Sequence, residues 1–136
     1  MKKTLSALLF ATILLYGCNE DENPKSGDFY VEASITPALE DQRWFIGNDT
    51  YGNVVNGGDL LKTDPLRVNS GDNISLVTGI IEATDQCHTV TLDFYYSGRR
   101  FESRVFEMEG FLGVNLFQGS DCKDGYEKPF NVIIPD

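Results

Sequence analysis

The chain has 136 residues, of which 21 are acidic and 11 are basic, and its formal net charge is −10 at neutral pH. A chain of this length suits one domain with a sizeable hydrophobic core. The acidity argues against nucleic acid as a partner, and against adhesion to an anionic membrane surface through protein charge. Cations and basic partners remain compatible with it.

The N-terminal segment has the length of a signal peptide. Two lysines precede an apolar stretch of about a dozen residues, which is too short to span a bilayer as a helix. The stretch ends in Leu15-Tyr16-Gly17-Cys18, which resembles the lipobox of bacterial lipoproteins. The resemblance implies that residues 1–17 are a signal peptide and that Cys18 receives the lipid, palmitate included, that anchors the chain to a membrane. Plain secretion and a retained anchor are the alternatives.

A polar segment follows the expected lipid-attachment site. Residues 18–27 contain Pro and Gly and have no apolar periodicity, so we expect a flexible tether. The acidic triplet Glu20-Asp21-Glu22 resembles the export signal of certain Gram-negative surface lipoproteins. That resemblance implies a domain on the outer face of the outer membrane, and the alternative is the periplasmic face.

Two cysteines remain if Cys18 carries lipid. In an oxidising compartment Cys87 and Cys122 are expected to form a disulfide. Two separate buried thiols are the structural alternative. A metal site with His88 is disfavoured, because the spacing matches no zinc pattern.

From Asp28 onward the pattern is that of β-strands separated by turns. Apolar and polar residues alternate over 29–36, as in a strand with one buried face. The expected strands cover residues 29–36, 44–46, 66–68, 74–83, 89–96, 99–108, 111–118 and 130–134. Seven to nine short strands predict an all-β fold over residues 28–136, a single β-sandwich of immunoglobulin-like or Greek-key type. A small lipocalin-like barrel is the alternative.

Two local features within this pattern predict irregular backbone. Residues 48–65 are rich in Gly, Asn and Asp, and we expect them to form the longest loop and the best place for function. Gly79 interrupts an apolar strand, which predicts a bulge or bend there.

A hairpin is the clearest expected element. Ser97-Gly98 is a plausible two-residue turn between residues 89–96 and 99–108. With that turn, Phe94 faces Phe101 on the inward side, and Val105 also points inward. On the outward side Tyr95 is exposed.

Catalytic and metal-binding motifs are scarce. The single histidine, His88, adjoins the expected disulfide and reads as a structural or surface residue rather than a general base. No nucleophile elbow, phosphate-binding loop or zinc-protease motif occurs, so we expect no enzyme and no cofactor. The oxygen-rich loops 48–50, 69–72 and 121–124 lack the ligand spacing of a calcium loop, and Asp, Asn and Gly there are expected to make turns.

Four aromatic residues are the best candidates for ligand contacts. They are Trp44, Tyr51, Tyr95 and Tyr126. Exposed aromatic side chains on a sheet can stack on sugar rings or anchor a protein partner, whereas packing in the core or at a strand edge is the structural alternative.

The expected function is therefore non-catalytic binding at the cell envelope. The membrane is engaged through the lipid anchor, and the ligand is a glycan or an envelope protein. A small hydrolase with an unrecognised carboxylate site is one rival. A lipocalin-like carrier of a small apolar ligand is the other.

Overall fold

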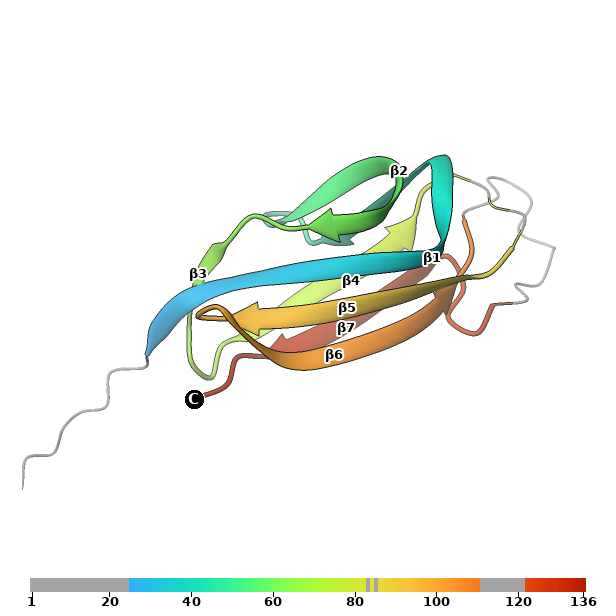
Figure 1. Ribbon diagram of the computed structural model, residues 1–136. Coiled ribbons are helices and arrows are strands. Elements are labelled where there is room, and N and C mark those ends of the chain that lie inside the picture. The colour runs from blue at the N-terminus through green and yellow to red at the C-terminus, as the bar shows by residue number, and fades with distance from the viewer. Residues whose placement is uncertain (1–24, 83, 85, 111–121) are drawn as a thin grey trace, which may run out of the picture.

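The computed structural model describes residues 25–82, 84, 86–110 and 122–136, and it contains strands but no helix among them (Figure 1). The all-β class predicted from the sequence is therefore confirmed. The expected lipid-attachment site Cys18, most of the tether and the expected strand at 111–118 lie outside the described residues. The strands are β1 (Ser26–Gly47), β2 (Gly52–Lys62), β3 (Leu66–Asn69), β4 (Asn73–Ile80), β5 (His88–Tyr96), β6 (Arg99–Met108) and β7 (Glu127–Ile133).

The strands form one sheet that nearly closes into a barrel, with the order β6-β5-β1-β4-β7 and with β2 and β3 also paired to β1. The first half of β1 pairs with β5, whereas its last four residues pair with β4. Between these halves the register against β2 shifts twice, as the chain crosses over (Figure 1). Two layers result. The β5 layer contains β6, β5 and the first half of β1, and the β4 layer contains the second half of β1, the start of β2, β4 and β7.

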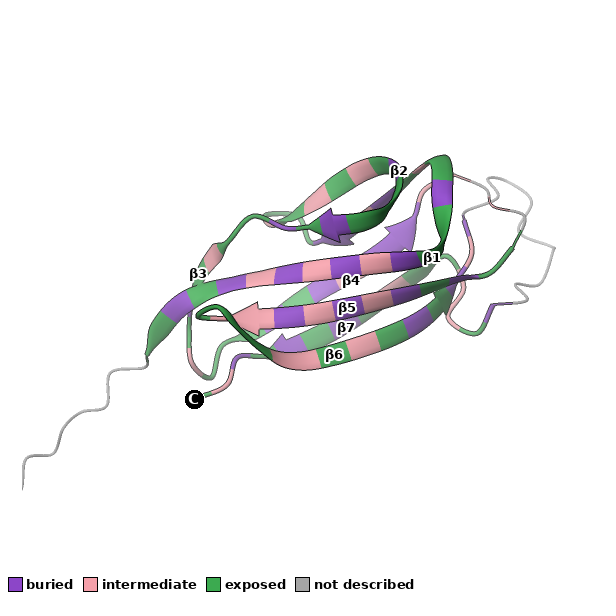
Figure 2. Cartoon of the chain, viewed as in Figure 1, coloured by how far each residue is buried: buried purple, intermediate pink, exposed green. Residues whose placement is uncertain are grey.

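Alternating burial along β1 explains why this segment forms a strand. Phe29, Val31, Ala33 and Ile35 are buried, and the residues between them are half-buried (Figure 2). The period of two expected from the sequence is confirmed, because each inward side chain enters the space between the layers. Aromatic side chains from four strands fill that space, namely Phe29, Trp44, Phe94, Phe106 and Phe130.

The first strand starts earlier than the predicted end of the tether. Ser26 and Gly27 already pair with Asn69 and Val68 of β3. Gly27 is buried, and a Cβ there would lie 2.1 Å from the Ser97 hydroxyl oxygen. Because Gly27 has no side chain, the start of β1 can pack against the turn at Ser97. Ser26 and Gly27 therefore belong to the domain and not to the tether.

The expected long loop at 48–65 is wrong for most of its length. Residues Gly52–Lys62 are β2, which pairs with both halves of β1. Gly57 and Gly58 have φ angles of 59° and 80°, and a Cβ at Gly57 would lie 2.2 Å from the Glu40 carbonyl oxygen. Glycine is thus required where β2 follows β1 around the bend. The Gly- and Asn-rich composition that predicted a loop therefore belongs to a strand that bends.

The β5–β6 hairpin has the predicted turn and a different register. Ser97-Gly98 has positive φ at both residues, 50° and 76°, which matches a type I′ turn. Beyond the first two residue pairs a register shift places Phe94 opposite Glu102 instead of Phe101. The inserted residue reverses the faces of β6 from there on, so Val105 points to solvent with 61% of its surface exposed.

Candidate recognition surface on the β4 layer

The outer face of the β4 layer carries apolar side chains next to a glycine. Trp44 is buried in the core, so its neighbour Phe45 faces outward. Phe45 lies between Val54 of β2, which is 59% exposed, and Gly79 of β4. A Cβ at Gly79 would come within 2.8 Å of the Phe45 ring. The bulge predicted at Gly79 is wrong, because Gly79 keeps a regular register and its missing side chain makes room for the ring.

A second row of residues beside Phe45 leaves the sheet surface hollow. Gly52 pairs with Gly47, Gly47 with Val77, and Val77 with Pro129. A Cβ at Gly47 would lie 2.2 Å from the carbonyl oxygen of Tyr51, and a Cβ at Gly52 would lie 2.2 Å from that of Ile46. The close approach of the two strands therefore excludes side chains at both positions, and a depression opens between Val54 and Val77.

The turn at Asn48–Tyr51 closes the hairpin beside this depression. The side-chain Oδ1 of Asn48 accepts hydrogen bonds from the backbone N–H of Thr50 (3.0 Å) and of Tyr51 (2.9 Å). Its amide nitrogen donates to the Ser75 carbonyl of β4 at 2.9 Å. This Asn-based turn agrees with the structural reading of residues 48–50 rather than with a calcium loop.

Three shallow hollows meet at the Asn48–Tyr51 turn, with volumes of about 480, 590 and 620 Å³. The charged residues that line them are Asp49, Asp72 and Glu127, and no lysine or arginine is among the described lining residues. We call these hollows together the trough. Its principal residues are Phe45, Asn48, Asp49, Val54, Val77 and Glu127.

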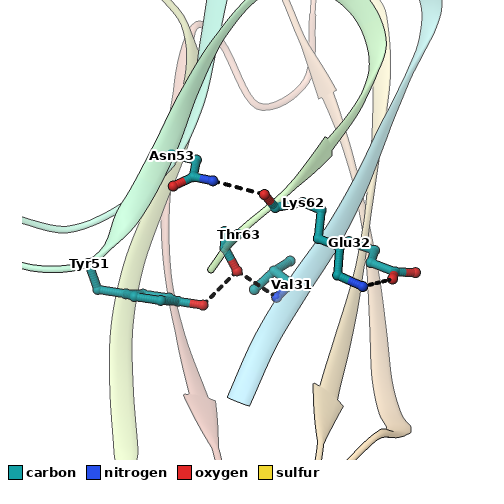
Figure 3. A network of polar contacts seen from close by, with 6 residues as sticks. All are labelled: Val31, Glu32, Tyr51, Asn53, Lys62 and Thr63. Atoms are coloured by element: carbon teal, nitrogen blue, oxygen red, sulfur yellow. Dashed lines mark hydrogen bonds and ion pairs between the residues drawn. The ribbon is translucent and has the colours of Figure 1, made fainter. Parts of the chain in front are cut away.

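Tyr51 lines the trough, but its hydroxyl group points into the domain (Figure 3). The hydroxyl lies 2.6 Å from Oγ1 of Thr63, a residue that is only 2% exposed. The same Oγ1 accepts the backbone N–H of Val31 at 2.8 Å. Burial raises the pKa of the Tyr51 phenol above its usual value. Tyr51 therefore ties the turn to the core, where its ring centroid lies 6.0 Å from that of the buried Phe29.

The other predicted aromatic contacts do not gather at the trough. Trp44 is fully buried, so its expected exposure is wrong; it sits on the inward side of the alternation in β1. Tyr95 is on the outer face of the β5 layer, where its ring stacks on Tyr30 with centroids 4.8 Å apart. Tyr126 lies directly before β7 and is 44% exposed. The structure thus separates four residues that the sequence grouped by type.

Charged groups beside Tyr95 neutralise one another. Lys62 Nζ lies 2.8 Å from Glu32 Oε1 (Figure 3) and 4.3 Å from the centroid of the Tyr30 ring. The hydrogen bond between Lys62 and Glu32 lowers the pKa of Glu32 and raises that of Lys62. Desolvation, followed by the hydrogen bond to Glu32, raises the pKa of Tyr95. Around Tyr95 the β5 layer therefore presents a positive and a negative charge that are paired with each other.

The structure joins Cys87 to Cys122 in a disulfide, in agreement with the expected pairing; their Cα atoms are 5.6 Å apart. The bridge connects the start of β5 to the segment before β7. His88 is buried beside it, and its Nδ1 donates to the Pro37 carbonyl at 2.7 Å. This agrees with a structural role for the histidine.

Sequence reasoning missed the residues that form the floor of the trough. Residues 44–46 read as one continuous apolar run, although Phe45 faces away from its two neighbours. Val54 fell inside the expected loop. The available signal was Gly47 directly after the run, since a glycine pair in a tight hairpin leaves a gap in the sheet surface.

The described residues include no group of three or more His, Cys, Asp or Glu side chains placed to hold a metal ion. Within the same part of the chain, no helix is long and apolar enough to cross a membrane. Comparisons with protein-family models, with curated proteins and with solved structures find no match to this chain.

Proposed function

We propose that the protein is a lipid-anchored, non-catalytic binding or accessory module of the bacterial outer membrane, and that it recognises an envelope partner through the trough. One observation carries this proposal. Phe45, Val54 and Val77 form an apolar strip on the outer face of a sheet, around a depression with polar margins. Apolar patches with polar rims are typical of sites that bind other molecules.

Electrostatics favour binding over hydrolysis. The pKa values of Glu32, Glu82 and Asp124 are all lowered, chiefly by a hydrogen bond from Lys62, from the Arg43 backbone N–H and from Lys128, respectively. A hydrolase with a carboxylate pair needs one carboxyl group with a raised pKa, so that it can donate a proton near neutral pH. These three carboxyl groups therefore lack the raised pKa of a general acid.

The packed interior favours recognition on the surface over carriage of a ligand inside the barrel. Trp44, Phe29 and Phe94 are fully buried between the layers, and the Phe94 ring also contacts those of Phe101 and Phe130. The hollows at the Asn48–Tyr51 turn open on the outside of the β4 layer instead. A carrier would need the space that these rings occupy.

The place of the trough fits an anchor at Cys18. Leu66 and Val68 of β3 line the third hollow, and β3 pairs with the first residues of β1. The trough therefore lies toward the end of the domain where the chain enters. The seven residues between Cys18 and Ser26 span about 24 Å when fully extended. Such a tether would keep the trough close to membrane-embedded partners.

A matched pair of exposed valines tests the binding surface. A photo-cross-linking amino acid replaces Val54 on the trough or Val105 on the β5 layer, which are 59% and 61% exposed. In intact cells the probe at position 54 should form a discrete adduct, and the probe at position 105 should not. Equal adducts from both positions, or none from either, would contradict the proposal.

The lipid anchor needs its own test. A clickable fatty-acid analogue should label the wild-type chain, and Cys18→Ala should abolish the label and leave an unprocessed precursor. Label on the Cys18→Ala chain, or an unlabelled wild type, would refute the anchor.

A further inference from the structure

We infer that the trough binds a positively charged segment of a partner protein that also carries apolar side chains. This inference rests on the proposed function and names the chemistry of its partner. Two independent features of the trough support it, an unbalanced negative charge at the margin and an apolar floor.

The carboxylates at the margin are not held in ion pairs with any described residue. Within the described part of the chain, neither Asp49 nor Glu127 takes part in an ion pair, and Asp49 is exposed within the Asn48–Tyr51 turn. The ion pairs recorded for the described residues all use other carboxylates. They are Arg43–Glu82, Lys62–Glu32, Arg67–Asp28, Arg100–Asp93, Arg104–Glu102 and Lys128–Asp124. The trough is thus a place where acidic side chains remain uncompensated.

The opposite layer provides a contrast within the same molecule. On the outer face of the β5 layer, Glu32 and Asp93 each have a basic partner, at 2.8 and 3.4 Å. The whole chain has a net charge of −10, which adds a long-range attraction for cations. Charge complementarity mainly governs specificity and the rate of encounter. A basic partner is therefore attracted more strongly to the trough than to the part of the β5 layer around Glu32 and Asp93.

The floor of the trough suits the stem of a long basic side chain. Phe45, Val54 and Val77 offer apolar surface, and the glycine pair Gly47 and Gly52 leaves space between them. Lysine and arginine bury their methylene groups along apolar surface while the charged end stays in water. An apolar neighbour in the same segment would occupy the gap above the glycines. An anionic glycan would meet like charge there.

Defined peptides test this chemistry on the purified full-length chain. The probe is a fluorescent peptide with alternating lysine and leucine among serines, and its anisotropy reports binding. One control peptide has glutamate in place of lysine, and the other has serine in place of leucine. We expect the lysine–leucine peptide to bind at least tenfold more tightly than either control. Its affinity should fall as salt rises from about 0.05 to 0.3 M, because exposed charges are screened.

Single substitutions separate the trough from general acidity. Asp49→Asn and Glu127→Gln should each weaken binding about two- to fivefold, as expected for exposed ion pairs. Asp59→Asn is the control, since Asp59 is exposed on β2 but does not line the trough. Val54→Ser should weaken binding, and Val105→Ser should leave it unchanged.

The outcomes distinguish this inference from the proposed function. Equal binding of the glutamate peptide, or equal loss from Asp59→Asn and Asp49→Asn, would overturn the inference. If adducts from position 54 form in cells while the peptides show no charge preference, the proposed binding function is supported and the inference of a basic partner is wrong. If the lysine–leucine peptide binds at the trough but neither lipid label nor adducts appear in cells, the inferred chemistry of the trough is supported and the proposed function at the envelope is wrong.

Discussion

The buried hydroxyl of Thr63 offers a quantitative test of how the turn beside the trough is held. Thr63→Val nearly conserves shape but removes the acceptor of the Val31 N–H at 2.8 Å and the partner of the Tyr51 hydroxyl at 2.6 Å. Each buried hydrogen bond contributes about 1 kcal/mol, and an unpaired group costs more, so the loss should be about 2–3 kcal/mol. In a domain of this size that lowers the melting temperature by about 10 °C.

Two companion variants isolate the hydroxyl from the methyl group. Thr63→Ser keeps the hydroxyl and should cost about 1 kcal/mol for the lost methyl group. Tyr51→Phe removes one of the two hydrogen bonds and should cost about 1 kcal/mol. Because both residues share a bond, Thr63→Val should be less costly in the Tyr51→Phe background, by about 1 kcal/mol.

Urea unfolding followed by tryptophan fluorescence measures these differences, since the single tryptophan, Trp44, is fully buried. A Thr63→Val chain within about 0.5 kcal/mol of wild type would refute the reasoning, because that is the range of an ordinary surface substitution. Additive losses in the double variant would also contradict a shared hydrogen bond.

Three further predictions concern the disulfide, acid stability and orientation. Replacing Cys87 and Cys122 by Ser should cost about 4 kcal/mol in urea unfolding, since the bridge spans 35 residues, and reductant should then have no further effect. The hydrogen bond from Lys128 lowers the pKa of Asp124 in the folded protein. The ionised carboxylate therefore stabilises the fold above its unfolded-state pKa, near pH 4, and this stabilisation is lost as the pH falls toward the lower folded-state pKa. Asp124→Asn should reduce the loss of stability in acid. Protease added to intact cells should cut the domain if it is surface-exposed, whereas cleavage only after the outer membrane is opened would place it in the periplasm.

Alternation allowed the sequence to predict the first strand, because one face of that strand is buried. Phe29, Val31, Ala33 and Ile35 all enter the core, and a shift by one residue would expose them all. The same logic supports the all-β class. The Ser97-Gly98 turn was also predictable, since its backbone needs positive φ at both positions.

Long-range pairing accounts for what the sequence did not predict. Gly57 and Gly58 look like loop residues, and only the bend of β1 shows why a strand needs them. The bulge that moves Val105 outward also places Phe106 beside Phe130 of β7, with the two ring centroids 5.6 Å apart. No local pattern contains that information.

The sequence did not predict which trough side chains point outward, because that also depends on long-range pairing. In a short apolar run, periodicity cannot show which residue faces out until the neighbouring strands are known. Phe45 faces outward because Trp44 beside it is buried, and Gly79 of β4 makes room for its ring. The uncompensated charges of Asp49 and Glu127 likewise depend on which basic residues the fold brings near them.

Thiol accessibility at the two matched valines tests the central claim most directly. Val54→Cys and Val105→Cys chains should react with a maleimide at similar rates when purified, because the two positions are 59% and 61% exposed. In isolated envelopes, a partner seated on the trough should slow labelling at position 54 severalfold and leave position 105 unchanged. Equal rates at both positions in the envelope would contradict recognition through the trough.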